Sequence, residues 1–195
     1  MKKTLSVGIC MAIATAYAGN TFANDLSYDY VQLSYVATDA DGLDVDGASL
    51  DGSLKLNDNV FVVAGFGHDR SDRIAGARAE LDSYNLGLGY RYGLNQLTDL
   101  VASASWVRGK IELNSGFGSF SDSDNGFALD VGLRHLLTPQ VELNAAVRYT
   151  DIFDADDTAL NLGALFHATP NLSVGVGYSV ASDADGWGVG IRLNF

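Results

Sequence analysis

The four-residue stretch Asp-Ala-Asp-Gly occurs twice, at 39–42 and at 183–186. Carboxylate oxygens are ligands that Ca²⁺ prefers, so the two copies raise the question of a cation site. Neither copy has the spacing of an EF-hand loop, which ends in a glutamate. Two interpretations stay open: ordinary polar turns, or a weak divalent-cation patch that the copies share, formed by Asp39, Asp41, Asp183 and Asp185.

The rest of the chain offers little for catalysis or for a cofactor. The histidines, His68, His135 and His167, lack the spacing of metal ligands. The single cysteine, Cys10, excludes a disulfide and a cysteine metal site. We therefore expect no enzyme and no cofactor. The formal net charge of −12 argues against nucleic acid as a partner, because phosphate backbones require basic surfaces.

The first residues are typical of a secretory signal peptide. Lys2 and Lys3 precede an apolar stretch over 5–18 that is too short to span a bilayer. Small residues then allow cleavage after Ala18 or after Ala23, and we expect Ala23 because strand-like residues begin just beyond it. The prediction is a cleaved signal peptide over 1–23 and one exported domain over 24–195.

That domain alternates apolar residues with small or polar ones at a period of two. Leu86, Leu88 and Tyr90, for example, alternate with Gly87 and Gly89. A helix would spread these apolar residues around its circumference, whereas a strand collects them on one face. The pattern predicts an all-β fold of ten strands, over 26–37, 48–56, 60–68, 79–92, 99–109, 125–136, 141–151, 159–167, 172–180 and 186–195.

Two ambiguities remain in this pattern. Merging two weak segments would leave eight strands instead of ten. In the first segment, Val31, Leu33 and Tyr35 form the better apolar face, which leaves Tyr28 and Tyr30 on the opposite face.

Three features indicate that the apolar face points outward into lipid rather than into a soluble core. The polar face consists mainly of Gly, Ser, Ala and Asn, which suit a narrow lumen. Aromatic residues lie near both ends of the strands, as in the belts of membrane barrels. Tight turns at one end face longer polar loops at the other, over 38–47, 69–78, 110–124, 152–158 and 181–185. These features predict a closed, antiparallel, up-and-down transmembrane β-barrel, with a soluble β-barrel as the weaker alternative.

The chain resembles the small outer-membrane β-barrels of Gram-negative bacteria, the group that includes the OmpA transmembrane domain. The resemblance covers 24–195 and is most specific in the terminal strand WGVGIRLNF, which ends at Phe195. It implies location in the cell outer membrane, contact with lipid and lipopolysaccharide, and recognition of Phe195 and its strand by the barrel-assembly machinery. OmpA-like barrels have eight strands, so the count of ten is a departure. We expect a monomer.

The inward face is predicted to carry a network of charges. Barrels of eight to ten strands are mostly filled by side chains, so these charges would pair with each other across the lumen. A tight turn at 138–140 would bring Arg134 close to Glu142, and Asp130 close to Arg148. The expected members are Asp51, Lys55, Asp82, Arg91, Asp130, Arg134, Glu142, Arg148 and Arg192.

Two functions follow from such a lumen. A narrow interior closed by ion pairs, with short acidic loops outside, favours a structural or interaction role in the outer membrane. The alternative is a narrow porin-like channel for ions or small polar solutes. An outer-membrane enzyme is the weaker possibility, because His68 lies near serines without a defined geometry.

Overall fold

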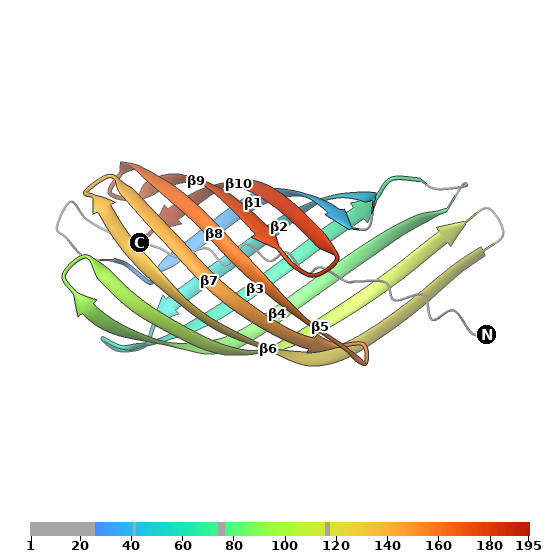
Figure 1. Ribbon diagram of the computed structural model, residues 1–195, viewed down its shortest axis with the longest axis horizontal. Coiled ribbons are helices and arrows are strands. Elements are labelled where there is room, and N and C mark those ends of the chain that lie inside the picture. The colour runs from blue at the N-terminus through green and yellow to red at the C-terminus, as the bar shows by residue number, and fades with distance from the viewer. Residues whose placement is uncertain (1–25, 41, 74–76, 116–117) are drawn as a thin grey trace.

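A computed structural model describes residues 26–40, 42–73, 77–115 and 118–195 of the chain. It shows ten strands in one sheet (Figure 1). The strands are β1 (Tyr30–Ala40), β2 (Leu43–Lys55), β3 (Val60–Ser71), β4 (Arg78–Asn95), β5 (Thr98–Ser115), β6 (Gly118–Thr138), β7 (Val141–Ile152), β8 (Ala155–Thr169), β9 (Leu172–Val180) and β10 (Ala184–Asn194). The predicted signal peptide lies outside the described residues.

The sheet closes on itself into a barrel. Each strand pairs antiparallel with its sequence neighbours, and β1 pairs with β10 from Tyr30↔Asn194 to Ala40↔Ala184. The prediction of a closed up-and-down barrel with ten strands is therefore confirmed, and the alternative of eight is wrong. Within the described residues, no helix has the length and apolar character needed to cross a membrane.

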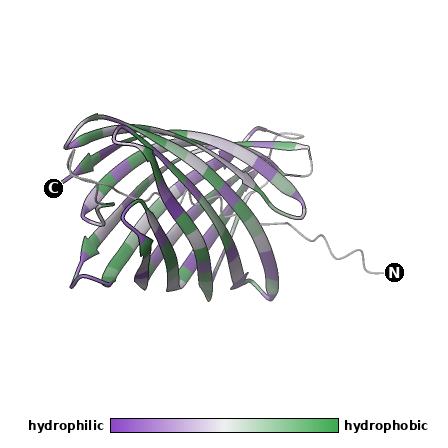
Figure 2. Ribbon diagram, turned by 60° about the vertical axis from the view of Figure 1, so that its left-hand side comes forward, coloured by the Kyte–Doolittle hydropathy of each residue, from purple (hydrophilic) through white to green (hydrophobic). Residues whose placement is uncertain are grey.

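Hydrophobic and hydrophilic residues alternate along the strands (Figure 2), and their burial alternates with them, as the period of two predicts. Apolar residues point outward and are exposed, with Leu88 at 57% and Ile191 at 56%. Inward positions on the same strands carry small, polar or charged residues such as Ser83, Ser173 and Arg192, which are buried. A soluble barrel would have the reverse arrangement, so the wall is built for a lipid exterior.

Two belts of outward-facing aromatic residues mark the ends of this apolar wall. We call the end with the tight turns at 56–59, 96–97, 139–140 and 170–171 the lower end, and the opposite end the upper end. Tyr90, Tyr92, Phe166 and Phe195 lie at the lower end. The upper belt consists of Tyr35, Phe66, Tyr84, Trp106, Phe127, Tyr149, Tyr178 and Trp187, including ring pairs such as Tyr35–Trp187 at 6.1 Å.

Hydroxyl groups of the upper belt reach carboxylates beyond it. Tyr35 Oη donates to Asp46 Oδ1 over 2.8 Å, and Tyr178 Oη donates to Asp185 Oδ2 over 2.9 Å. Each ring thus keeps its apolar body at the depth of the wall and its hydroxyl toward the polar side, as expected of tyrosine at a lipid interface.

Several strands continue further at the upper end than the sequence pattern predicts. β4 and β5 have 18 residues each and β6 has 21, so most of the predicted loop 110–124 is strand. The hairpin of β5 and β6 extends furthest beyond the rest of the barrel (Figure 1). Both faces of this extension meet water, so its residues need no apolar alternation and give no period-two signal. A hydrogen bond from Lys110 to Glu112 within it raises the pKa of the ammonium group.

The outward face provides a direct test of the membrane orientation. Leu88 lies on β4 midway between Tyr84 and Tyr92, which belong to the two belts. We expect Leu88→Arg to lower the free energy of unfolding in lipid vesicles by about 2–4 kcal/mol, because it places a charge in the hydrocarbon region. The matched change Leu113→Arg, on the projecting hairpin, should cost less than about 1 kcal/mol. Equal losses in urea unfolding would contradict the placement of the wall in lipid.

Candidate functional site

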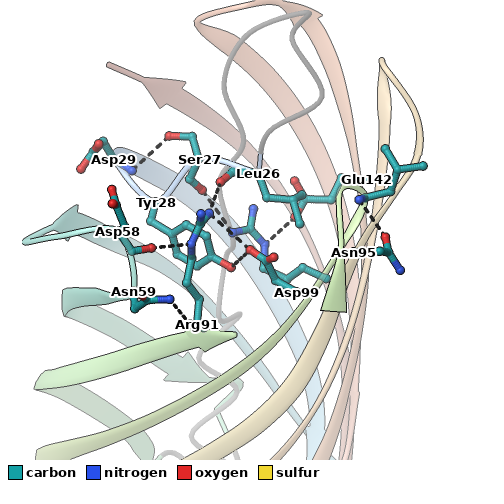
Figure 3. A network of polar contacts seen from close by, with 12 residues as sticks. Leu26, Ser27, Tyr28, Asp29, Asp58, Asn59, Arg91, Asn95, Asp99 and Glu142 are labelled. Carbon is teal, nitrogen blue, oxygen red and sulfur yellow. Dashed lines mark hydrogen bonds and ion pairs between the residues drawn. The ribbon is translucent and has the colours of Figure 1, made fainter. Parts of the chain in front are cut away.

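The lower part of the lumen holds a segment of the chain that is not part of the barrel wall. Leu26 to Asp29 precede β1 and turn into the barrel, and we call them the inserted segment (Figure 3). Leu26 is 5% exposed and Tyr28 is 1% exposed. Both pack in one apolar cluster with Phe61, Val101 and Leu136, which project from the wall. The predicted first strand over 26–37 was therefore wrong at its start.

Tyr28 lies at the centre of this arrangement. Its hydroxyl donates to Asp99 Oδ2 over 2.8 Å, and its ring centroid is 4.8 Å from that of Phe61. The guanidinium carbons of Arg134 and Arg91 lie 4.4 Å and 5.2 Å from the same ring. A cation over a desolvated aromatic ring stabilises by about 2 kcal/mol. One side chain thus donates a hydrogen bond, packs against another ring and contacts two cations.

The two arginines also hold the backbone of the inserted segment. Arg91 Nη1 donates to the carbonyl oxygen of Leu26, and Arg134 Nη1 donates to that of Ser27, both over 3.1 Å. Asp29 joins the segment to the rim, because its carboxylate accepts from the Lys55 backbone N–H and its carbonyl accepts from the Phe195 N–H. A backbone segment away from its own sheet needs such donors, and here the wall supplies them.

Phe61 fits beside Tyr28 because the facing position on β4 is a glycine. A Cβ atom at Gly89 would lie 2.1 Å from the Phe61 ring. The phenyl ring therefore lies flat against the bare backbone of the wall, and any larger residue would push it toward the centre of the lumen.

Behind Tyr28 lies a fully buried ion pair. Arg134 Nε donates to Glu142 Oε1 over 2.8 Å, and both side chains are 0% exposed. Glu142 Oε2 is 3.6 Å from His167 Nε2, and His167 Nδ1 is 2.8 Å from Ser173 Oγ. Glu142 thus faces a cation and an imidazole at once, which offsets the cost of burying its charge.

Ser173, His167 and Glu142 have the residue types of a hydrolase triad, but the serine lies at Nδ1 of the imidazole and the carboxylate at Nε2, the reverse of the triad arrangement. Ser173 is fully buried and its oxygen also accepts from Asn194 Nδ2 over 3.3 Å. A nucleophile must reach a substrate carbonyl, and this hydroxyl has no exposed surface. The group therefore orders the lumen instead of presenting a nucleophile.

A second set of charged residues lies elsewhere in the lumen. Arg148 Nη1 is 3.5 Å from Asp130 Oδ1, and Ser103 Oγ donates to the other oxygen of Asp130 over 3.2 Å. Asp51 accepts from Ser49 Oγ over 2.8 Å. Arg192 Nε donates to Gln32 Oε1 over 2.9 Å.

Nearer the upper end, the lumen contains an apolar cluster. Val107, Ala128 and Ile152 are buried there with the ring of Phe153 beside them. Phe153 and Asp154 have φ of +57° and +56°, which costs about 1–3 kcal/mol at each non-glycine residue. Two contacts keep the turn in place: the Phe153 N–H donates to Asp124 Oδ2 over 2.9 Å, and the Phe153 ring covers Gly109, where a Cβ atom would be 2.6 Å away.

Two residues assigned to the lumen by sequence are placed elsewhere. Asp82 points outward, in phase with exposed Tyr84 and opposite to buried Ser83, and its carboxylate lies 2.6 Å from His68 Nδ1 on the outer face. Lys55 has the inward phase but is exposed at the lower end, in no ion pair with another described residue. The others lie in the lumen, although Asp51 and Arg192 pair with neutral groups, and Arg91 lies 3.4 Å from Asp99 Oδ2.

The most important lumen residues missed by sequence are Tyr28, Asp99 and Phe61. Asp99 and Phe61 share the inward phase of Val101 and Val63 on their strands, so strict alternation could have found them. Tyr28 has the phase of buried Gln32 and Ser34, which resolves the earlier ambiguity: Tyr28 and Tyr30 face the lumen. No sequence signal showed that the segment leaves the wall.

The two Asp-Ala-Asp-Gly copies are neighbours at the upper end, where Asp39 pairs with Asp185 between β1 and β10. Asp39 Oδ1 accepts from the Gly42 N–H over 2.8 Å, as in an ordinary polar turn. Across the part of the chain that is described, no group of three or more His, Cys, Asp or Glu residues is arranged to hold a metal ion. Asp41 lies outside that part, so the cation patch stays a prediction.

The barrel, its lipid-facing wall and its belts agree with the comparison to known families. The model of the outer membrane protein beta-barrel domain matches residues 4–195. The chain belongs to this family. It is an outer-membrane β-barrel, as the resemblance drawn from the terminal strand implied. The comparison with curated proteins finds no match.

Solved structures of other outer-membrane barrels share the fold. Ail, the attachment invasion locus protein of Yersinia pestis, is 16% identical, with 86% of this chain and 97% of Ail covered and a TM-score of 0.50. The KdgM porin is 11% identical, with coverages of 85% and 99% and a TM-score of 0.52. The beta domain of the Bordetella autotransporter BrkA is 10% identical, with coverages of 86% and 99% and a TM-score of 0.55. At such identities the likeness shows the fold alone.

The buried Arg134–Glu142 pair of this outer-membrane barrel makes a clear prediction. Glu142→Leu leaves the Arg134 charge buried without its carboxylate, so the free energy of unfolding should fall by about 3–5 kcal/mol. The double change Arg134→Leu with Glu142→Leu removes both charges and should cost less than Glu142→Leu alone. Urea unfolding in vesicles measures both. A double change that costs as much as Glu142→Leu alone, or more, would contradict the coupling of the two side chains.

Proposed function

We propose that the protein is a closed outer-membrane barrel that acts through its exposed upper face, in a structural or interaction role, and does not form an open pore. The observation that carries this proposal is the inserted segment. Tyr28, Arg134 and Phe61 meet in the centre of the lower lumen, and each is buried. Side chains from the wall and from the segment thus occupy the space that a conducting path would need.

The proposal assigns a side of the membrane to each end of the barrel. The tight turns and the inserted segment face the periplasm, and the projecting sheet of β4 to β6 faces the outside of the cell. This sheet exposes Phe120 at 61% and Leu113 at 45%, which lie opposite each other across β5 and β6. It is the surface best placed for contacts with lipopolysaccharide or with another molecule outside the cell. A catalytic role is not part of the proposal.

The last strand and the closure of the sheet bear on how the barrel assembles and on its oligomeric state. The outward residues Val189, Ile191 and Leu193 of β10 and the following Phe195 form the apolar series that we propose the barrel-assembly machinery recognises. One chain supplies every strand of the closed sheet, so a monomer is sufficient.

A narrow channel for small polar solutes is the second candidate. It is favoured by a cavity in the lumen that Arg192 lines. Conduction through it would require the inserted segment to leave the lower lumen. The two candidates therefore differ in whether Tyr28 stays in place.

Single-channel recording in planar bilayers separates them. We expect the unmodified protein to show no stable openings. Tyr28→Ala should produce openings, because it removes the ring that Arg91 and Arg134 surround. Tyr90→Ala, which removes an exposed tyrosine from the outer face, is the matched control and should stay silent. Stable openings of the unmodified protein, with the same conductance as the Tyr28 variant, would contradict the closed barrel and support the channel.

A further inference from the structure

A cavity of about 60 Å³ lies inside the barrel, against the wall formed by β8, β9, β10 and β1. Its polar lining includes Gln32, Ser34, Asn144, Asn161, Ser179 and Arg192. It extends along the wall from Arg192 up to Gly186, beside Trp187 of the upper belt. A water molecule needs roughly 10–15 Å³ of cavity volume, so the cavity has room for several waters or for one small ion.

The cavity exists because this side of the wall carries glycine at many inward positions. Gly163, Gly175, Gly177, Gly188 and Gly190 all line it. The adjoining strands β6 and β7 carry the large side chains Arg134 and Arg148, which lie close to their own carboxylates. The cavity is therefore a consequence of the glycines in β8 to β10. Arg192 is the one arginine among its lining residues.

That arginine makes no ion pair with a described residue, although the charges of Glu142 and Asp51 act on it at longer range. Arg192 is 1% exposed, its Nε donates to Gln32, and its guanidinium lies 4.4 Å from the centre of the Tyr30 ring. Its Nη1 and Nη2 atoms have no hydrogen-bond partner among the described residues. The acidic residue nearest in register is Asp51, one strand further round than Gln32. Its carboxylate is already hydrogen-bonded to Ser49.

A second donor in the cavity is also without a partner. Asn161 lies on β8 and is 9% exposed, and its Nδ2 atom makes no hydrogen bond within the described part of the chain. Buried polar groups are nearly always satisfied, and buried charges are paired. Three nitrogen atoms at this cavity thus lack an acceptor in the described chain: Nη1 and Nη2 of the Arg192 guanidinium and Nδ2 of Asn161. Because the guanidinium is a cation, a negatively charged acceptor would satisfy it best.

We propose that the cavity beside Arg192 binds a small oxyanion, a carboxylate or a phosphate group. A guanidinium presents two parallel N–H groups that match the two oxygens of such an anion, and charge-assisted hydrogen bonds of this kind are among the strongest in proteins. Asn161 supplies a further donor from the neighbouring wall. The site reaches toward the upper end of the barrel, so it does not depend on release of the inserted segment and goes beyond the proposed function.

Nuclear magnetic resonance of the protein in detergent micelles tests this site. Sodium phosphate and sodium acetate are titrated separately against sodium chloride at equal ionic strength. We expect a saturable shift of the Arg192 Nε–Hε and Asn161 side-chain amide signals with at least one oxyanion, and no such shift with chloride. The Arg134 Nε–Hε signal is the internal control, because that guanidinium is paired with Glu142. The phosphate and acetate titrations distinguish the two chemical sources.

Two variants make the result specific. Arg192→Gln should weaken binding at least about tenfold, seen at the Asn161 amide, because the charge-assisted bonds are lost. Gly177→Val should also abolish binding while keeping Arg192, because it fills the cavity; the first added atom would lie 3.6 Å from the Leu162 carbonyl oxygen, an ordinary contact. Absence of a saturable shift with both oxyanions, or equal binding by Arg192→Gln, would overturn the proposal and leave ordered water as the occupant.

Discussion

The constraint on which this molecule depends is that backbone N–H and C=O groups facing a hydrocarbon exterior must find partners within the protein. β1 and β10 meet that requirement by pairing along their length, so the sheet has no open edge. With the edge removed, outward side chains can be apolar throughout, as Leu88 and Ile191 are. Everything polar that the sequence carries at the depth of the wall is then forced inward.

A ten-stranded barrel gives those inward groups little room and little water. The lumen therefore buries charged side chains as a protein core buries apolar ones, and each charged side chain needs a specific polar or charged partner. Arg134 and Glu142 satisfy each other and, through Tyr28, fix a piece of chain that lies outside the sheet. At Arg192 the surrounding inward positions are glycines, so the guanidinium lies beside a cavity instead of beside a carboxylate. The filled lower lumen and the cavity beside Arg192 both follow from the same alternating pattern of inward residues.

This pattern also sets what sequence could and could not show. Outward residues such as Leu86, Leu88 and Tyr90 alternate because lipid selects one face, and that selection made strand number, closure and orientation predictable. The tight turn after Thr138 made the approach of Arg134 to Glu142 predictable too. Beyond the upper belt water replaces lipid, so the extra length of β5 and β6 left no periodic trace. The inserted segment was hidden for a different reason: the partners of Tyr28 are on β3 to β6, which local patterns cannot connect to it.

The position of the inserted segment has a consequence for the order in which the barrel forms. Tyr28 and Asp99 are 71 residues apart in sequence, and Ser27 and Arg134 are 107 apart. Residues near the start of the described chain thus acquire their partners only after β6 has joined the sheet. Closing loops of that length before their contacts form is entropically unfavourable, so such contacts consolidate late. The segment that fills the lower lumen is expected to be among the last parts of the molecule to settle, after the wall around it is in place.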